Sequence, residues 1–286
     1  MDIFFASLLP LAVVVIMFSL GLGLTPNDFR RIIERPRAFC LGAVNQIILL
    51  PLIAYGIIMI FGFTAETAVG IMILAACPGG AVSNIVTRLA RWDVALSVTL
   101  TASFSLTCVL TIPFILDFAV FRFMGSATPD FDIAATAITA FLYTALPIAL
   151  GLSLRSLAPE VTAALAPLMF KIAMVLFFGV IAGAILSNWQ IVADNFASLG
   201  LGLLTLIGAV SVAGYVVSRG LKTTSCEAKT IAIETGVQNG ALALAIAGVL
   251  GTGGAAFNAY SVPAALYGVV WLGSALPAFL LLSRGK

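Results

Sequence analysis

The amino-acid sequence predicts an all-α polytopic membrane protein with nine transmembrane helices. Hydrophobic residues make up 62% of the 286 residues and charged residues only 9%, whereas about a quarter of an ordinary soluble domain is charged. The mean hydropathy is +1.17, and the apolar residues form long runs. Because backbone polar groups find no water in lipid, such runs cross a membrane only as helices. We therefore expect a single transmembrane domain.

Nine apolar runs are each close to the roughly 20 residues that a membrane-spanning helix needs. They cover residues 5–24, 38–61, 66–89, 93–119, 134–154, 159–186, 196–218, 227–250 and 259–282. The formal net charge is only +2, and its carriers are scattered along the chain. This distribution argues against a nucleic-acid partner, which would select a clustered basic surface.

Basic residues are distributed unequally between the two sets of alternate loops. Of the 14 Lys and Arg residues, twelve lie in one set of loops or at the C-terminus: Arg30, Arg31, Arg35, Arg37, Arg88, Arg91, Arg155, Arg219, Lys222, Lys229, Arg284 and Lys286. The opposite loops hold only Arg122, together with Asp117, Asp130, Asp132 and Asp194. Since basic loops stay in the cytoplasm, we expect the N-terminus outside and the C-terminus inside, in the inner (plasma) membrane.

Two of the apolar runs are interrupted by residues that do not favour a helix. The third run contains the segment 77–84 (CPGGAVSN), and the eighth contains the segment 234–240 (ETGVQNG). Broken helices at matching places in two halves of a chain are typical of transporters built from inverted repeats. Runs 1–4 match the last four of runs 5–9, so we expect a 4+5 inverted repeat whose discontinuous helices cross. The competing interpretation is that each helix is only kinked at this place and that the packing of neighbouring helices accommodates the kink.

Oxygen-bearing side chains converge on one predicted layer of the membrane. Counting helical rise from the basic ends places Gln46, Ser97, Thr101, Glu234 and Gln238 about 6 to 14 Å deep. Two further residues, Ser83 and Asn84, reach a similar level. Glu234 is the one carboxylate that we place inside the membrane, where ionisable groups usually mark ion or substrate pathways. The competing interpretation, strongest for the two hydroxyl residues of run 4, is helix-to-helix packing.

An anionic solute is the predicted cargo. The second halves of both broken helices begin near mid-membrane, so each presents unpaired N–H groups and a positive dipole end to the crossing. Lys171 lies about twelve residues into the sixth run, near the midplane. Its ammonium group would either face the crevice and pair with a carboxylate or sulfonate, or extend along the helix to the interface.

Several segments of the sequence resemble the signatures of the bile acid:sodium symporter family, and the resemblance extends over almost the whole chain. The resemblance is carried by the segments 77–84 and 234–239, by 95–97 (ALS), by 21–25 (GLGLT) with 28–29, and by 45–46 ahead of Pro51. It implies a panel of helices (5–24, 134–154 and 159–186) against a core (38–119 and 196–282). Bacterial members often have ten helices, so this chain resembles a nine-helix variant that lacks the first.

The resemblance also implies particular binding residues. One sodium ion would be held by Ser83, Asn84, Ser97, Thr101 and Glu234, and a second by Gln46, Glu234, Gln238 and the carbonyls near Thr235 and Val237. The solute would face Asn239, Gly240 and the backbone around Ala81. Many members carry Thr where this chain has Ala81, and Lys171 stands where an apolar residue is expected. Both departures favour a compact organic anion over a bile acid, and the candidate cargoes are bile-acid-like, pantoate-like or other carboxylates and sulfonates.

The sequence therefore predicts a sodium-coupled symporter that carries a small organic anion with two sodium ions by alternating access. The alternative within the same fold is a proton-coupled or uncoupled organic anion exchanger. An enzyme is not expected, because the chain has no histidine and the candidate nucleophiles Cys77 and Ser83 have no base. A receptor would not require two matched broken helices. The oligomeric state stays open.

Overall fold

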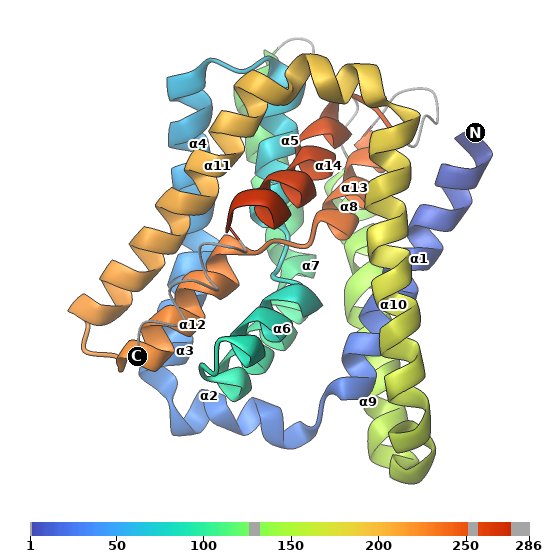
Figure 1. Cartoon of the computed structure of the whole chain (residues 1–286), viewed down its shortest axis with the longest axis vertical. Coiled ribbons are helices and arrows are strands. Elements are labelled where there is room, and N and C mark those ends of the chain that lie inside the picture. The colour runs from blue at the N-terminus through green and yellow to red at the C-terminus, as the bar shows by residue number, and fades with distance from the viewer. Residues whose placement is uncertain (1, 126–131, 251–256, 276–286) are drawn as a thin grey trace.

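The computed structural model describes residues 2–125, 132–250 and 257–275, which form a bundle of helices joined by short links (Figure 1). Five helices in these ranges are long and apolar enough to cross a membrane: Pro36–Phe61, Val94–Met124, Ile133–Leu157, Pro159–Ser187 and Trp189–Gly220. The bent pair Leu8–Gly23 and Pro26–Glu34 adds a sixth if it is one span. The all-helical, polytopic architecture is confirmed, and the count of nine stays a prediction.

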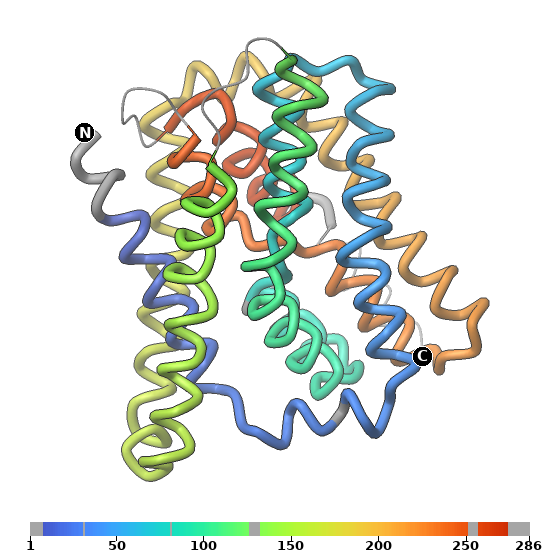
Figure 2. Tube along the Cα trace, turned by 180° about the vertical axis from the view of Figure 1, so that it is seen from behind, coloured from blue at the N-terminus to red at the C-terminus, as the bar shows by residue number. Residues whose placement is uncertain are grey.

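One group of helices forms a layer at one side of the molecule. It contains α1 (Asp2–Gly23), α9 (Leu146–Leu157) and α10 (Pro159–Ser187), and α1 packs mainly on α9 and α10 (Figure 2). Glycine permits this close packing, because a Cβ on Gly151 would lie 2.5 Å from the carbonyl oxygen of Phe18. Helix α8 (Ile133–Ala140) leads into α9 through a π-helical turn, Phe141–Ala145.

The remaining helices build a second, larger group. It contains α3 (Pro36–Val44), α4 (Leu50–Phe61), α7 (Val94–Met124), α11 (Trp189–Gly220) and α14 (Val262–Val270). A short link, Pro26–Arg30 and α2 (Arg31–Glu34), joins α1 to α3 along one end of the molecule (Figure 1).

Proline causes a local change of helix type between α3 and α4. Residues Asn45–Leu49 form a π-helical turn, in which the N–H of Leu50 donates to the carbonyl of Asn45. Pro51 follows directly and has no N–H to donate, so the usual hydrogen-bond ladder is interrupted there. The pair Leu146 and Pro147 repeats this arrangement after the turn Phe141–Ala145.

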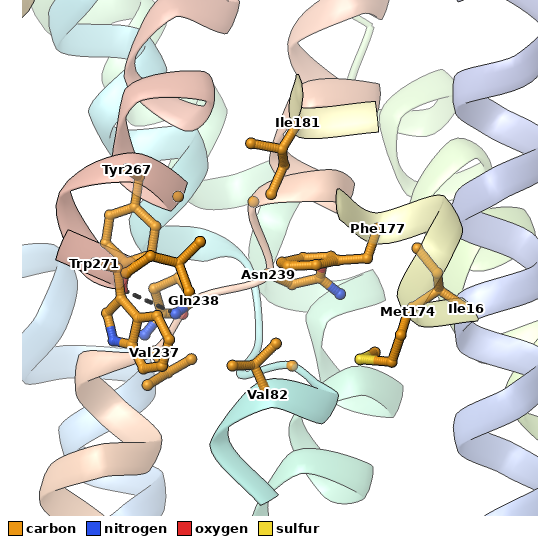
Figure 3. A pocket seen from close by; sticks show the side chains of 14 residues that line it. Ile16, Val82, Met174, Phe177, Ile181, Val237, Gln238, Asn239, Tyr267 and Trp271 are labelled. Carbon is orange, nitrogen blue, oxygen red and sulfur yellow. Dashed lines mark hydrogen bonds between the residues drawn. The ribbon is translucent and has the colours of Figure 1, made fainter. Parts of the chain in front are cut away.

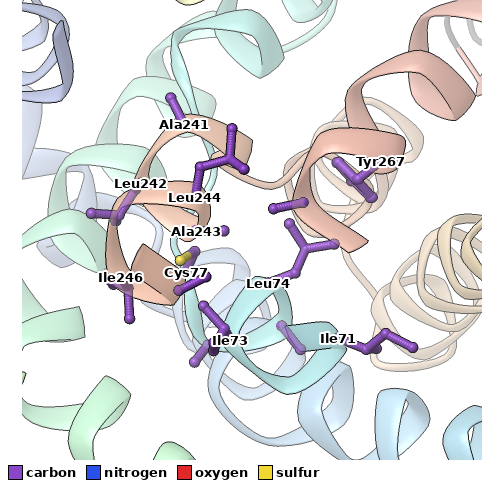
Figure 4. Packing of buried hydrophobic residues seen from close by; sticks show 14 of the residues in the cluster. Ile71, Ile73, Leu74, Cys77, Ala241, Leu242, Ala243, Leu244, Ile246 and Tyr267 are labelled. Atoms are coloured by element: carbon purple, nitrogen blue, oxygen red, sulfur yellow. The ribbon is translucent and has the colours of Figure 1, made fainter. Parts of the chain in front are cut away.

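Both predicted helix breaks are present. The third run divides into α5 (Ala65–Ala76) and α6 (Ala81–Leu89), and the eighth into α12 (Ser225–Gly236) and α13 (Gly240–Leu250). Around the crossing, the side chains of α5 and α13 pack on one another (Figure 4), and Leu74, Cys77 and Leu242 are completely buried. In lipid such packing, rather than exclusion of water, holds helices together.

One boundary prediction is wrong. The seventh helix does not begin near residue 196, because α11 starts at Trp189, and only Asn188 separates it from the end of α10. Asp194, which the charge pattern placed in a loop, lies inside α11 and accepts a hydrogen bond from Gln190 at 3.0 Å. These first turns run across the top of the molecule in Figure 1 before α11 descends, so polar residues are accommodated in a helix.

Candidate functional site

The two breaks meet in the interior of the protein. Cys77 and Val237 adopt extended conformations at the ends of α5 and α12, as expected for Cys77 because the α region is disfavoured before a proline. Gly79 and Gln238 form an isolated antiparallel bridge, and the N–H of Asn239 donates to the carbonyl of Pro78 at 2.9 Å. The unwound segments therefore satisfy each other's backbone groups where water is absent.

A buried carboxylate lies beside this crossing. Glu234 of α12 is only 2% exposed. The hydroxyl of Ser97 lies 2.9 Å from its Oε2, and the hydroxyl of Thr101 hydrogen-bonds to its Oε1. A Cβ on Gly79 would lie 2.5 Å from that same Oε1, so the glycine gives the carboxylate room. The contact between α7 and α12 at this point is therefore made by oxygen atoms, the hydroxyls of α7 and the carboxylate of α12.

Asn84 of α6 completes this cluster, which we call the Glu234 cluster. Its Oδ1 lies 2.8 Å from the hydroxyl of Ser97 and 3.4 Å from that of Thr101. Each hydroxyl carries one hydrogen, so two hydrogens face three acceptors: the two carboxylate oxygens and the amide oxygen. Lone pairs are in excess, and a hard cation such as sodium is the partner that oxygen ligands of this kind suit.

Carboxamides form a second cluster, the Gln46 cluster, on the other side of the crossing. The Nε2 of Gln46 donates to the carbonyl of Cys77 at 2.9 Å and to Oε1 of Gln238 at 3.0 Å. The Nε2 of Gln238 donates in turn to the carbonyl of Thr235 at 2.7 Å. The Oε1 of Gln46 is buried without a partner among the described residues. A buried acceptor of this kind is costly unless something occupies it.

Tyr267 of α14 supports this cluster, and the sequence did not single it out. Its hydroxyl donates to the carbonyl of Gly236 at 2.5 Å and accepts from the N–H of Gln238 at 3.0 Å. It therefore satisfies two backbone groups that the break in α12 leaves unpaired. A tyrosine in an apolar helix carries no sequence signal for such a role.

A cavity of about 560 Å³ lies on the far side of the crossing (Figure 3). Gly80, Asn239 and Gly240 form its polar wall, and Met174 and Phe177 of α10 form part of the opposite wall. Its further lining residues are Ile16, Val82, Ile181, Val237, Gln238, Tyr267, Gly268, Trp271 and Leu272. The apolar wall of α10 follows a helical stripe, but apolar residues at helical spacing are too common to identify a pocket.

Asn239 presents an unused donor at this cavity. Its Oδ1 accepts from the N–H of Leu242 at 3.1 Å and so caps α13. Its Nδ2 is buried without a partner among the described residues, and Figure 3 shows this nitrogen on the side of Phe177 and Met174. The cavity therefore offers hydrogen-bond donors where two helices begin, which suits an anion.

The structure brings most, but not all, of the predicted residues together. Ser83 is buried at the start of α6, although its hydroxyl donates to the carbonyl of Gly80 at 2.7 Å. The backbone of Ala81 opens α6, and its side chain lies outside the described part. Lys171 is exposed and does not line the cavity of Figure 3. It lies about 90° around α10 from the stripe of Phe170, Met174 and Phe177.

Comparison with known proteins matches the chain to one family and to several sodium-dependent transporters and cotransporters. Residues 10–195 match the model of the Sodium Bile acid symporter family. The sodium-dependent transporter YocS of Bacillus subtilis is 26% identical over 82% of this chain and 71% of its own length. The human ileal sodium/bile acid cotransporter is 26% identical over 84% of this chain and 68% of its own length. The probable chloroplastic sodium/metabolite cotransporter BASS2 of rice is 27% identical over 81% of this chain, which spans only 54% of that relative.

Proposed function

Because the chain belongs to the Sodium Bile acid symporter family, we propose that it carries a compact organic anion across the membrane together with sodium ions. The observation that carries this proposal is the buried Glu234, held by hydroxyls of α7 beside two broken helices. A carboxylate inside a membrane protein needs a cation or a proton to compensate its charge. No Lys or Arg ion pair with Glu234 occurs among the described residues, so a bound cation is the partner that we assign.

Two sodium ions fit the two clusters. The first would bind Asn84, Ser97, Thr101 and Glu234, with Ser83 joining once its hydroxyl turns from Gly80. The second would bind Gln46, Gln238, Glu234 and the carbonyls of Thr235 and Val237. In support of this, Oε1 of Gln46 is unpartnered, and the first cluster has more acceptors than hydrogens.

The solute would occupy the cavity of Figure 3, with its carboxylate or sulfonate at Asn239, Gly240 and the start of α6. Its apolar part would contact Phe177 and Met174. Lys171 receives no role in binding, because its side chain does not line this cavity.

Transport would follow from movement of one group of helices against the other. The layer of α1, α9 and α10, with α8 continuing into α9, would act as a panel, and the remaining helices, with the crossing, as the core. Sodium would neutralise Glu234 and order the crossing before the anion binds. Two sodium ions with a monoanion move one net charge inward, which a potential of 100 mV favours by about 2.3 kcal/mol. We place the N-terminus outside and the C-terminus in the cytoplasm.

The test is uptake of small carboxylates and sulfonates into proteoliposomes that contain the purified protein. We expect accumulation of at least one such anion to depend on an inward sodium gradient and to increase with an inside-negative potential. Uptake that a proton gradient drives, with no response to sodium, would instead favour the proton-coupled exchanger and refute sodium coupling.

A further inference from the structure

A second cavity adjoins the first on the side that carries the Arg-rich link Pro26–Glu34. Its volume is about 800 Å³, and Ile16 and Met174 line both cavities. Helices α1, α6, α7 and α10 form its walls, with the residues Ser19, Leu20, Gly23, Leu24, Asn84, Ile85, Arg88, Val94, Val98, Phe170 and Ala173. The two cavities are therefore successive parts of one crevice between the two groups of helices.

Arg88 is the one charged residue among the described residues that line this crevice. It lies on the same face of α6 as Asn84 and Ile85, one turn beyond the Glu234 cluster. Its side chain is exposed, and no carboxylate forms an ion pair with it in the described part of the chain. An arginine in the last turn also complements the helix dipole, but that effect does not require a position on the crevice wall.

We propose that Arg88 is a second anion station, which binds the carboxylate or sulfonate of the solute between the crossing and the basic side of the protein. This rests on the proposed function. Eight residues of α6 separate Arg88 from Gly80, or about 12 Å, so a compact anion occupies one station at a time. Apolar, low-dielectric walls concentrate the field of a single charge. The positive charge of Arg88 thus attracts the anion away from the crossing and toward the basic side of the protein.

The experiment measures charge selectivity at a thiol placed in the second cavity. Ser19 lines this cavity and is nearly isosteric with cysteine, so Ser19→Cys is the reporter, in a background where the exposed Cys40 and Cys226 are serine. The reagents are methanethiosulfonates with an anionic sulfonate, a cationic trimethylammonium or a neutral methyl group. With Arg88 present, we expect the anionic-to-cationic rate ratio to exceed that of a free thiol. The anionic rate should also saturate with concentration.

Arg88→Gln should lower this ratio roughly 3- to 10-fold and make the anionic rate linear in concentration, whereas Arg88→Lys should retain most of the effect. Arg91→Gln is the matched control, because Arg91 is exposed but lines neither cavity. An unchanged ratio in Arg88→Gln, or an equal fall in Arg91→Gln, would overturn the proposal. The proposal would also be overturned if the neutral reagent did not react with the thiol of Ser19→Cys. None of these readouts needs sodium-coupled flux, so a failure of the proposed function would be seen separately.

Discussion

At the scale of single residues, the site is a cluster of oxygen atoms in which the acceptors outnumber the hydroxyl hydrogens that can be donated to them. Glu234, Asn84, Ser97 and Thr101 come from three helices and lie within hydrogen-bond reach of each other. Such a cluster is unfavourable in a dry interior unless a proton or cation compensates it. Substitutions that remove one oxygen should therefore weaken cation binding more than they weaken the fold.

Thr101→Val removes one hydroxyl at nearly constant volume. We expect the sodium concentration for half-maximal thermal stabilisation to rise about tenfold, equivalent to about 1.4 kcal/mol. Thr99→Val is the control on the same helix, since Thr99 is equally buried but donates to the carbonyls of Asp28 and Ala95. It should lower the melting temperature without changing the sodium dependence. Equal sodium affinity in both variants would exclude Thr101 as a ligand.

Gly79→Ala tests the room given to the carboxylate. The new Cβ would lie 2.5 Å from Oε1 of Glu234, so the carboxylate must move away from Thr101. We expect loss of sodium-dependent stabilisation, measured by thermal shift with sodium and with choline. Gly56→Ala is the control, because nothing lies within 4 Å of its Cβ position in α4. A sodium response that survives in Gly79→Ala would contradict the geometry.

At the scale of helices, the breaks in α5–α6 and α12–α13 depend on partners that replace the missing helical hydrogen bonds. The two unwound segments pair with each other through Pro78, Gly79, Gln238 and Asn239. Tyr267 satisfies the end of α12. The position of the proposed cation ligands is thus set by contacts between distant parts of the chain.

Tyr267→Phe leaves the carbonyl of Gly236 and the N–H of Gln238 without this partner. Each unsatisfied buried group costs about 1–3 kcal/mol, so we expect a lower melting temperature together with weaker sodium binding. Tyr143→Phe is the control, because the Tyr143 hydroxyl has no hydrogen bond among the described residues. If both variants bind sodium as the parent does, Tyr267 serves stability alone.

The breaks and the polar layer could be predicted from the sequence, because helical rise is constant and depth follows from counting. This placed Glu234 with Ser97, and Gln46 with Gln238. The direction of a side chain around a helix in lipid is harder to predict, since α10 carries apolar residues on every face. Phe177 therefore gave no signal, and the orientation of Lys171 away from the cavity could not be read from its depth. Tyr267 reaches the break only through tertiary packing.

At the scale of the whole molecule, the two groups of helices enclose a crevice, and the places that we propose for ions and for solute are separate. The proposed cation ligands lie in the larger group of helices, whereas the cavity proposed for the solute also has walls from α1 and α10. Ion binding should therefore survive changes on the α10 wall, whereas solute binding should not.

Met174→Trp adds bulk to a residue that lines both cavities. We expect sodium-dependent thermal stabilisation to remain and uptake of the anion to be lost. Val175→Trp is the control, because Val175 is 72% exposed on the adjacent face of α10. Loss of the sodium response in Met174→Trp, with Val175→Trp normal, would show that the two sites are not separate.

The most direct test of the central claim is equilibrium binding of radioactive sodium to the purified protein without any solute. Glu234→Gln keeps the shape of the side chain and removes its charge, and Glu160→Gln is the control at an exposed position. We predict saturable binding in the parent and in Glu160→Gln, and none above background in Glu234→Gln. Binding by Glu234→Gln with the affinity and capacity of the parent would contradict the account.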